Sequence, residues 1–257
     1  MPADFADQIV LVTGAGSGIG RASALAFTRR GAKVFAADLN AEGLAETLEL
    51  AHAAGGQAET VVLDVSQEEQ VADLLARIER DAGRLDAAFN NAGITGGTHL
   101  IEDYPVDDFD RVLRVNLRSV FLGMKHELPL MKRAGRGAIV NTASVAAATG
   151  PGGMSAYAAS KHGVLGLTRV AAMENAAHGI RVNALAPGWT ETPMVTANSA
   201  QNPAFAELAR KAIPAKRGGR PEEIADAAVW LASPQASYVF GQMIVVDGGM
   251  TIGGFEP

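Results

Sequence analysis

Short runs of aliphatic and β-branched residues alternate along the chain with longer segments in which apolar residues recur at helical spacing. The runs that predict strands are Ile9–Thr13, Lys33–Ala37, Glu59–Leu63, Leu85–Phe89, Ala138–Thr142, Arg181–Leu185 and Met243–Val246. The segments that predict helices are Ile19–Arg29, Ala41–Ala53, Gln67–Asp81, Val106–Lys132, Ala156–Ala177 and Glu222–Leu231. Several strand runs are apolar without interruption, which is typical of strands that helices cover on both faces. The pattern predicts one α/β domain with a doubly wound parallel sheet of about seven strands.

One segment breaks this alternation. From about residue 189 to residue 219 the pattern is long and mixed, with one short helix expected at Ala204–Ala212. A loop of this length inside a compact domain is usually functional or disordered. We expect it to border a substrate site.

Charge and composition narrow the class of protein. The net charge is −6 and no block of Lys or Arg occurs, which argues against nucleic-acid and membrane-surface partners. The chain has no cysteine, so disulfides and thiolate chemistry are excluded. The acidic start lacks a secretory pattern and no stretch approaches the roughly 20 apolar residues of a membrane span. We expect a cytoplasmic enzyme.

The histidines are scattered without the spacing of metal ligands, and they are His52, His99, His126, His162 and His178. We therefore expect no catalytic metal.

A glycine-rich turn comes directly after the first predicted strand. It reads Thr13-Gly14-Ala15-Gly16-Ser17-Gly18-Ile19-Gly20 and opens a helix. Such a turn lets backbone amides approach a pyrophosphate at the helix N-terminus, although the same pattern is compatible with a plain tight turn. This is the pattern of a Rossmann-type fold, so we expect residues 1–257 to form a single dinucleotide-binding domain.

The second predicted strand ends at Asp38, about twenty residues further on, where a carboxylate can accept both ribose hydroxyls. A 2′-phosphate there would face a like charge, and Ser17 offers it no cation. We predict NAD as the cofactor. The alternative is that Asp38 only caps the next helix.

These features, taken together with later motifs, resemble the short-chain dehydrogenase/reductase family, and its classical subgroup in particular. The motifs that carry the resemblance are the turn Thr13–Gly20, Asn90-Asn91-Ala92-Gly93, Asn116, Ser144, Tyr157-Ala158-Ala159-Ser160-Lys161 and Pro187-Gly188. The resemblance extends from about Gln8 to Gly249.

The resemblance implies roles for the matching positions. Tyr157 would be the general acid/base and Lys161 its partner, Ser144 would bind the substrate oxygen, and Asn116 would hold a helix open around a water. The cofactor would be bound by Gly14, Ser17, Gly18, Ile19, Asp38, Asp64, Val65, Asn91, Ala92, Gly93, Tyr157, Lys161, Pro187, Gly188, Thr190 and Thr192. The family also implies a homotetramer.

The chemistry of the pair agrees with these roles. Tyr157 and Lys161 are four residues apart in a predicted helix and so share a face. A nearby cation favours the phenolate and lowers a tyrosine pKa from its usual value near 10. The plain alternatives are an exposed Tyr–Lys pair, a capping Ser144 and a solvent-facing Asn116.

The chain departs from the family pattern after Pro187-Gly188. Thr190 stands where an aliphatic residue is usual, whereas Thr192 is kept. Trp189 is either a pocket wall or a structural aromatic. The candidate substrate contacts are Val145, Trp189 and Met194, in surroundings that are small and apolar.

We therefore predict an NAD-dependent enzyme that interconverts a neutral, hydrophobic or cyclic secondary alcohol and its ketone. The alternatives are a reductase of 3-oxoacyl thioesters on an acyl carrier protein and a catalytically silent, cofactor-sensing protein. The silent protein would be expected to lose Ser144, Tyr157 or Lys161, and the chain has all three.

Overall fold

The computed structural model describes residues 4–201, 207, 210–211 and 213–253. Its strands are β1 (Ile9–Thr13), β2 (Lys33–Asp38), β3 (Gln57–Val62), β4 (Ala87–Asn90), β5 (Gly137–Thr142), β6 (Ile180–Pro187) and β7 (Met243–Val246). In the described part of the chain they form one parallel sheet in the order β3-β2-β1-β4-β5-β6-β7. The Rossmann-type fold predicted from the sequence is confirmed, and strand bounds differ by two residues at most.

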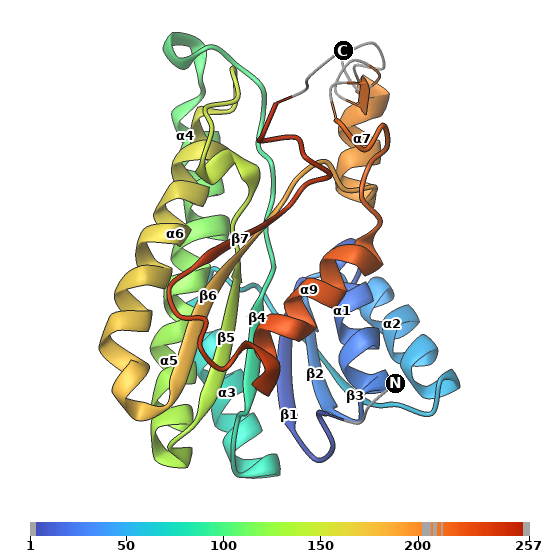
Figure 1. Cartoon of the computed structure of the whole chain (residues 1–257), viewed down its shortest axis with the longest axis vertical. Coiled ribbons are helices and arrows are strands. Elements are labelled where there is room, and N and C mark those ends of the chain that lie inside the picture. The colour runs from blue at the N-terminus through green and yellow to red at the C-terminus, as the bar shows by residue number, and fades with distance from the viewer. Residues whose placement is uncertain (1–3, 202–206, 208–209, 212, 254–257) are drawn as a thin grey trace.

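Helices cover both faces of the sheet (Figure 1). They are α1 (Gly18–Arg29), α2 (Ala41–Ala53), α3 (Glu68–Ala82), α4 (Val106–Leu113), α5 (Ser119–Ala134), α6 (Ser155–Asn175), α7 (Pro193–Gln201) and α9 (Pro221–Ala232). Helices α1, α2 and α9 pack in one apolar core, and α3, α5 and α6 pack in the other. Within the described residues no helix is both long and apolar enough to cross a membrane.

The central strands supply both cores because their side chains alternate between the faces. In β1, Ile9 and Leu11 belong to the core under α3, α5 and α6, whereas Val10 and Val12 belong to the other. All five residues of β1 are buried. This explains why the strand reads as an uninterrupted apolar run in the sequence.

The predicted helix Val106–Lys132 is wrong as a single α-helix. The chain forms α4, then a π-helical turn at Arg114–Arg118, and then α5. Asn116 lies in this turn and is fully buried, and its side chain bonds outside its own helix. A widened turn of this kind is common at functional sites.

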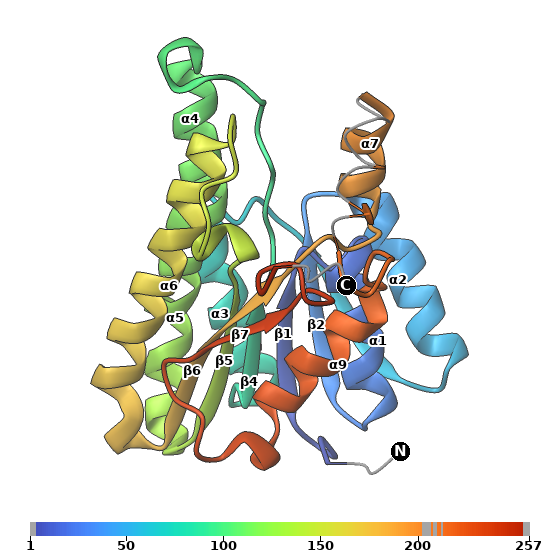
Figure 2. The same ribbon diagram turned by 45° about the horizontal axis from the view of Figure 1, so that its top comes forward.

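The segment from 189 to 219 begins with a bridge between Thr190 and Gly219 and continues into α7. The helix predicted at Ala204–Ala212 lies for the most part outside the described residues. Helices α4 and α7 both stand beyond the carboxyl ends of the strands (Figures 1 and 2).

Candidate active site

The sheet order reverses between β2 and β4, which lie on opposite sides of β1. In open α/β sheets ligands bind at such a switch point, beyond the carboxyl ends of the strands. A cleft of about 620 Å³ lies there, within the size range of cofactor and substrate pockets.

Most of the predicted site residues meet in this cleft. It is lined by Gly14, Ser17, Gly18, Ile19, Asp38, Asp64, Val65, Asn91, Ala92, Gly93, Ser144, Tyr157, Lys161, Pro187, Gly188, Thr190, Thr192 and Met194. The predicted residues that do not line it are Asn116, Val145 and Trp189. Residues far apart in sequence thus form one continuous wall, because most of them lie just beyond the end of a parallel strand.

The turn after β1 is shaped by close approaches of backbone. A Cβ on Gly20 would lie 1.9 Å from the Gly14 carbonyl oxygen, and one on Gly14 would lie 2.8 Å from Asn91 Nδ2. Gly14 and Gly18 have positive φ values of 68° and 51°. Side chains would therefore clash or strain the turn, and the bare backbone at the start of α1 fits a pyrophosphate.

Asp38 closes the β2 end of the cleft. Its Oδ2 accepts a hydrogen bond of 2.8 Å from the Gly16 amide, and its Oδ1 accepts one of 2.9 Å from the Asn40 amide. The N-cap of α2 is Asn40, whose side chain accepts from the Gly43 amide. Asp38 is therefore not the helix cap, and the carboxylate is held at the cleft wall by two backbone donors.

Asn91, which directly follows β4, ties the chain there to Thr13 at the end of β1. Its backbone amide donates to Thr13 Oγ1 at 3.0 Å, and its side-chain amide donates to the Thr13 carbonyl at 3.1 Å. The neighbouring Gly93 is needed for space, because a Cβ there would lie 3.1 Å from Asn116 Oδ1 and 3.6 Å from Lys161 Nζ.

Asn116 does not line the cleft, but its side chain binds the backbone of Ile94, which does. Its Oδ1 accepts from the Ile94 amide at 2.8 Å, and its Nδ2 donates to the Ile94 carbonyl at 2.8 Å and to Ser160 Oγ at 3.1 Å. Ser160 in turn donates to the Tyr157 carbonyl at 2.7 Å. The alternative of a solvent-facing asparagine is wrong, since Asn116 is fully buried.

Ser144, Tyr157 and Lys161 converge at the β5 end. The Tyr157 hydroxyl is hydrogen-bonded to Ser144, and Lys161 Nζ lies 5.6 Å from the Tyr157 ring centroid. Lys161 is buried and donates to the Thr142 carbonyl at 2.7 Å. Ser144 Oγ also accepts from the Ala146 amide at 3.2 Å, so the serine caps a short 3₁₀ turn, Val145–Ala147, as well.

Burial controls the ionisation of this pair. It raises the pKa of the Tyr157 phenol above its ordinary value, while the hydrogen bond with Ser144 acts in the opposite direction. It lowers the pKa of the Lys161 ammonium to about 8. The expectation that the tyrosine pKa lies below its usual value is therefore not met, because loss of solvation raises it.

The three predicted substrate contacts differ in position. Met194 lines the cleft from α7. Val145 is half-buried in the turn after Ser144, and the Trp189 indole lies where a Cβ on Gly218 would approach it at 3.2 Å. This geometry favours a structural role for Trp189 at the base of the loop.

Several residues of the cleft wall were not predicted from the sequence. They are Leu39, Leu63, Ser66, Gln67, Ile94, Arg111, Arg114, Val115, Thr142, Ala143 and Pro193. Most of them adjoin a predicted motif or strand, so their neighbours were the available signal. Arg111 and Arg114 come from α4 and the π-helical turn, and no motif marks them.

Comparison with known proteins agrees with this geometry. A family model described as enoyl-(acyl carrier protein) reductase matches residues 14–251. The chain is 43% identical to levodione reductase of Leifsonia aquatica over 254 residues (96% of this chain and 95% of that protein). It is 41% identical to a 3-oxoacyl-[acyl-carrier-protein] reductase of Thermotoga maritima (95% and 98%) and 40% identical to cyclohexanol dehydrogenase of Acinetobacter sp. (96% and 96%).

Solved structures give the same result. A crystal structure of levodione reductase matches with a TM-score of 0.92 at 42% identity, covering 96% of this chain and 99% of that one. A structure of NAD⁺-bound xylitol dehydrogenase matches with a TM-score of 0.92 at 34% identity, covering 95% and 99%. The chain belongs to the classical short-chain dehydrogenase/reductase family, whose members are oxidoreductases that bind a nicotinamide cofactor.

Proposed function

We propose that this protein is an NAD-dependent oxidoreductase that interconverts a neutral, cyclic or hydrophobic secondary alcohol and its ketone. The observation that carries the proposal is the layout of one cleft. Ser144, Tyr157 and Lys161 meet at one end of it, and a glycine-rich helix start with the Asp38 carboxylate forms the other.

Tyr157 is the proposed general acid/base. Its raised pKa keeps the phenol protonated at neutral pH, and a protonated phenol is the acid that ketone reduction requires. Ser144, already bonded to that hydroxyl, is placed to donate to the same substrate oxygen. In the reverse direction Tyr157 must first lose its proton, and the tyrosinate then accepts the proton of the alcohol.

Lys161 supports the phenol electrostatically. Its pKa of about 8 leaves the ammonium mostly charged at neutral pH, and this charge favours the tyrosinate as the proton leaves. The Thr142 carbonyl and the Asn116–Ile94 pair hold the side chains around it in place. The bound nicotinamide cofactor would donate or accept the hydride.

The preference for NAD rests on Asp38. Both carboxylate oxygens are tied to backbone amides, so the side chain is held at the cleft wall rather than free to swing away. A 2′-phosphate beside it would meet a like charge, which costs several kcal/mol in a partly desolvated site. The two ribose hydroxyls of NAD would instead donate to it.

The substrate class rests on the apolar side chains of the cleft. Ile94, Pro187, Met194 and Val195 are among its lining residues, and the two arginines on its wall are on the α4 side, where Arg114 interacts with Asp64. The names of two relatives, levodione reductase and cyclohexanol dehydrogenase, support a cyclic ketone or alcohol.

A second candidate is reduction of a 3-oxoacyl thioester, which the Thermotoga maritima relative favours. Asp38 and the net charge of −6 argue against it, because that reaction commonly uses NADP and an acidic carrier. The silent, cofactor-sensing alternative is disfavoured by the joint presence of Ser144, Tyr157 and Lys161. The homotetramer, the cytoplasmic location and the absence of nucleic-acid partners stay predictions.

The test is absorbance at 340 nm with the purified protein. Cyclohexanol and NAD, or a cyclic diketone and NADH, should be turned over with a kcat/KM at least ~100-fold better than with NADP(H), as the charge argument requires. Exclusive turnover of an acyl thioester with NADPH would support the second candidate. Cofactor binding without turnover of either class would support the silent one.

A further inference from the structure

The chain between β4 and α4 has no regular secondary structure from 91 to 100, yet polar contacts fix it at several points. Its start is tied to Thr13 Oγ1 through the amides of Asn91 and Ala92, at 3.0 and 3.2 Å. The next contact is the pair of hydrogen bonds between Ile94 and Asn116. The family motifs account for these two attachments, but not for the contacts of residues 96–99.

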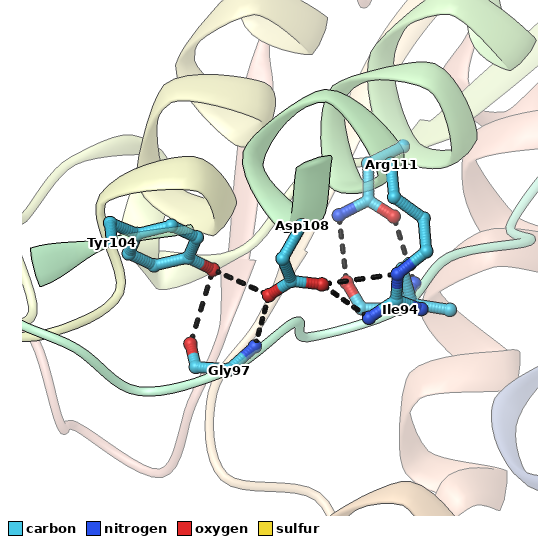
Figure 3. A network of polar contacts seen from close by, with 6 residues as sticks. Ile94, Gly97, Tyr104, Asp108 and Arg111 are labelled. Carbon is cyan, nitrogen blue, oxygen red and sulfur yellow. Dashed lines mark hydrogen bonds and ion pairs between the residues drawn. The ribbon is translucent and has the colours of Figure 1, made fainter. Parts of the chain in front are cut away.

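A third attachment, formed by Tyr104, Asp108 and Arg111, holds the segment further along (Figure 3). Asp108 on α4 accepts from the Gly97 amide at 2.7 Å and from the Tyr104 hydroxyl at 3.3 Å, both through Oδ2. The Tyr104 hydroxyl also lies 3.1 Å from the Gly97 carbonyl oxygen, so it can donate to either acceptor. Arg111 Nε donates to Asp108 Oδ1 at 3.0 Å.

The approach between segment and helix is close. A Cβ on Gly96 would lie 2.5 Å from Val112 Cγ2 and 2.8 Å from the Tyr104 hydroxyl oxygen, and the φ of Gly96 is 72°. The Tyr104 ring is also packed edge-on against His99 at 5.5 Å and Phe109 at 6.4 Å between centroids. Loss of the hydroxyl alone would therefore leave the ring in place.

The ionisation states of Asp108 and Tyr104 favour the hydrogen bonds of this third attachment. Hydrogen bonding from the Gly97 amide and from Arg111 holds the pKa of Asp108 below its ordinary value. Burial, together with the Asp108 charge, raises the pKa of Tyr104. At neutral pH, Asp108 is a carboxylate and Tyr104 keeps the proton that it donates.

The 94–99 segment connects two parts of the proposed active site. Ile94, at its start, lines the cleft. At its end, the His99 amide donates to the Gly153 carbonyl at 3.0 Å, and a Cβ on Gly153 would lie 2.8 Å from Thr98 Cγ2. The 149–154 segment leads directly into α6, which carries Tyr157.

We propose that Tyr104 and Asp108 are positioning residues, which hold the 94–99 segment as a wall at the substrate end of the cleft and so favour binding of bulky ketones and alcohols. The inference rests on the proposed function for its effect on substrate. The chain before this attachment is fixed separately, by Thr13 at Asn91 and by Asn116 at Ile94. Loss of the third attachment should thus weaken substrate binding and spare the cofactor.

The test compares Y104F and D108N with the matched control Y238F, since Tyr238 is 97% exposed. Gly97 and Arg111 donate to different oxygens of Asp108, and in D108N one of these oxygens is replaced by an NH₂ group, which cannot accept. Y104F removes only a hydroxyl. We expect KM for a cyclic ketone to rise by about three- to tenfold in Y104F, the effect of one hydrogen bond, and further in D108N. The kcat should stay within about twofold and the Kd of NAD should not move.

Amide hydrogen exchange tests the attachment without reference to catalysis. Peptides that contain residues 94–99 should exchange faster in Y104F and D108N than in the wild type and in Y238F. If the wild type turns over no alcohol or ketone, the proposed function fails while this readout still tests the attachment. Unchanged exchange in both variants would overturn the inference, as would equal changes in ketone KM and in the Kd of NAD.

Discussion

Glu127 offers a quantitative test of the packing beneath the active site. It lies on α5 and is fully buried; its Oε2 accepts from Asn90 Nδ2 at 3.1 Å, while its Oε1 has no hydrogen-bond partner among the described residues. Asn90 also donates to Asn141 Oδ1 at 3.0 Å, and Asn141 donates to Thr168 at 3.0 Å. The network joins the ends of β4 and β5, which carry the catalytic wall.

Burial raises the pKa of Glu127 from 4.5 to about 8, with the Asn90 hydrogen bond acting in the opposite direction. Between these two values Glu127 is ionised in the unfolded chain and neutral in the folded protein, so unfolding releases a proton. The contribution of this group to stability is therefore fully present below pH 4.5, falls as the pH rises, and is lost above about pH 8. At about 1.4 kcal/mol per pH unit the total loss is on the order of 5 kcal/mol.

The variant Glu127→Gln keeps the shape of the side chain and removes the titration. The free energy of unfolding, measured by urea denaturation at several pH values from 5 to 8, should fall with pH more steeply in the wild type than in E127Q. Glu49→Gln, at an exposed position of α2, is the matched control and should follow the wild-type profile. A wild-type profile parallel to that of E127Q would refute the assignment of a buried, protonated carboxyl.

Three further predictions concern the cleft. Asp38→Ala should lower the ratio of kcat/KM for NAD over NADP by about 10²-fold, because it removes the negative charge that would repel the 2′-phosphate of NADP. Glu49→Gln is the control for loss of a surface carboxylate. An unchanged ratio in Asp38→Ala would show that other residues select the cofactor. Gly93→Ala should reduce kcat for ketone reduction, since its Cβ would lie only 3.1 Å from Asn116 Oδ1. A kcat equal to that of the wild type in this variant would show that the side chains around Gly93 can move aside without cost. In the wild type, kcat for ketone reduction should fall as the pH rises through about 8, where Lys161 loses its charge. It should fall further at higher pH, where Tyr157 loses its proton. A kcat that rises over this range would contradict the role of Tyr157 as the acid.

The sheet could be predicted because local signals agree with the fold. Each central strand is a short apolar run, and most functional motifs come directly after such a run, so parallel strands bring the motifs to one edge. Ser144 comes just after β5 and Asp38 ends β2, and both lie in the cleft as the order of elements requires.

The features that the sequence could not predict depend on contacts between distant elements. Helical periodicity continues through Arg114–Arg118, so it does not reveal the π-helical turn that accommodates Asn116. Glu127 comes after Lys125 and His126 and has the appearance of a surface residue, but it is buried beside Asn90. Similarly, burial raises the pKa of Tyr157, and a spacing of four residues contains no information about solvation.

The proposed function depends most directly on proton transfer by Tyr157 at the substrate oxygen. Tyr157→Phe removes the hydroxyl that bonds Ser144 and leaves the ring beside Lys161. The measurement is kcat for reduction of a cyclic ketone with NADH, together with the Kd of NADH from its fluorescence. We predict a kcat lower by about 10²- to 10⁴-fold with a Kd close to that of the wild type. A kcat within about threefold of the wild type would contradict this role of Tyr157.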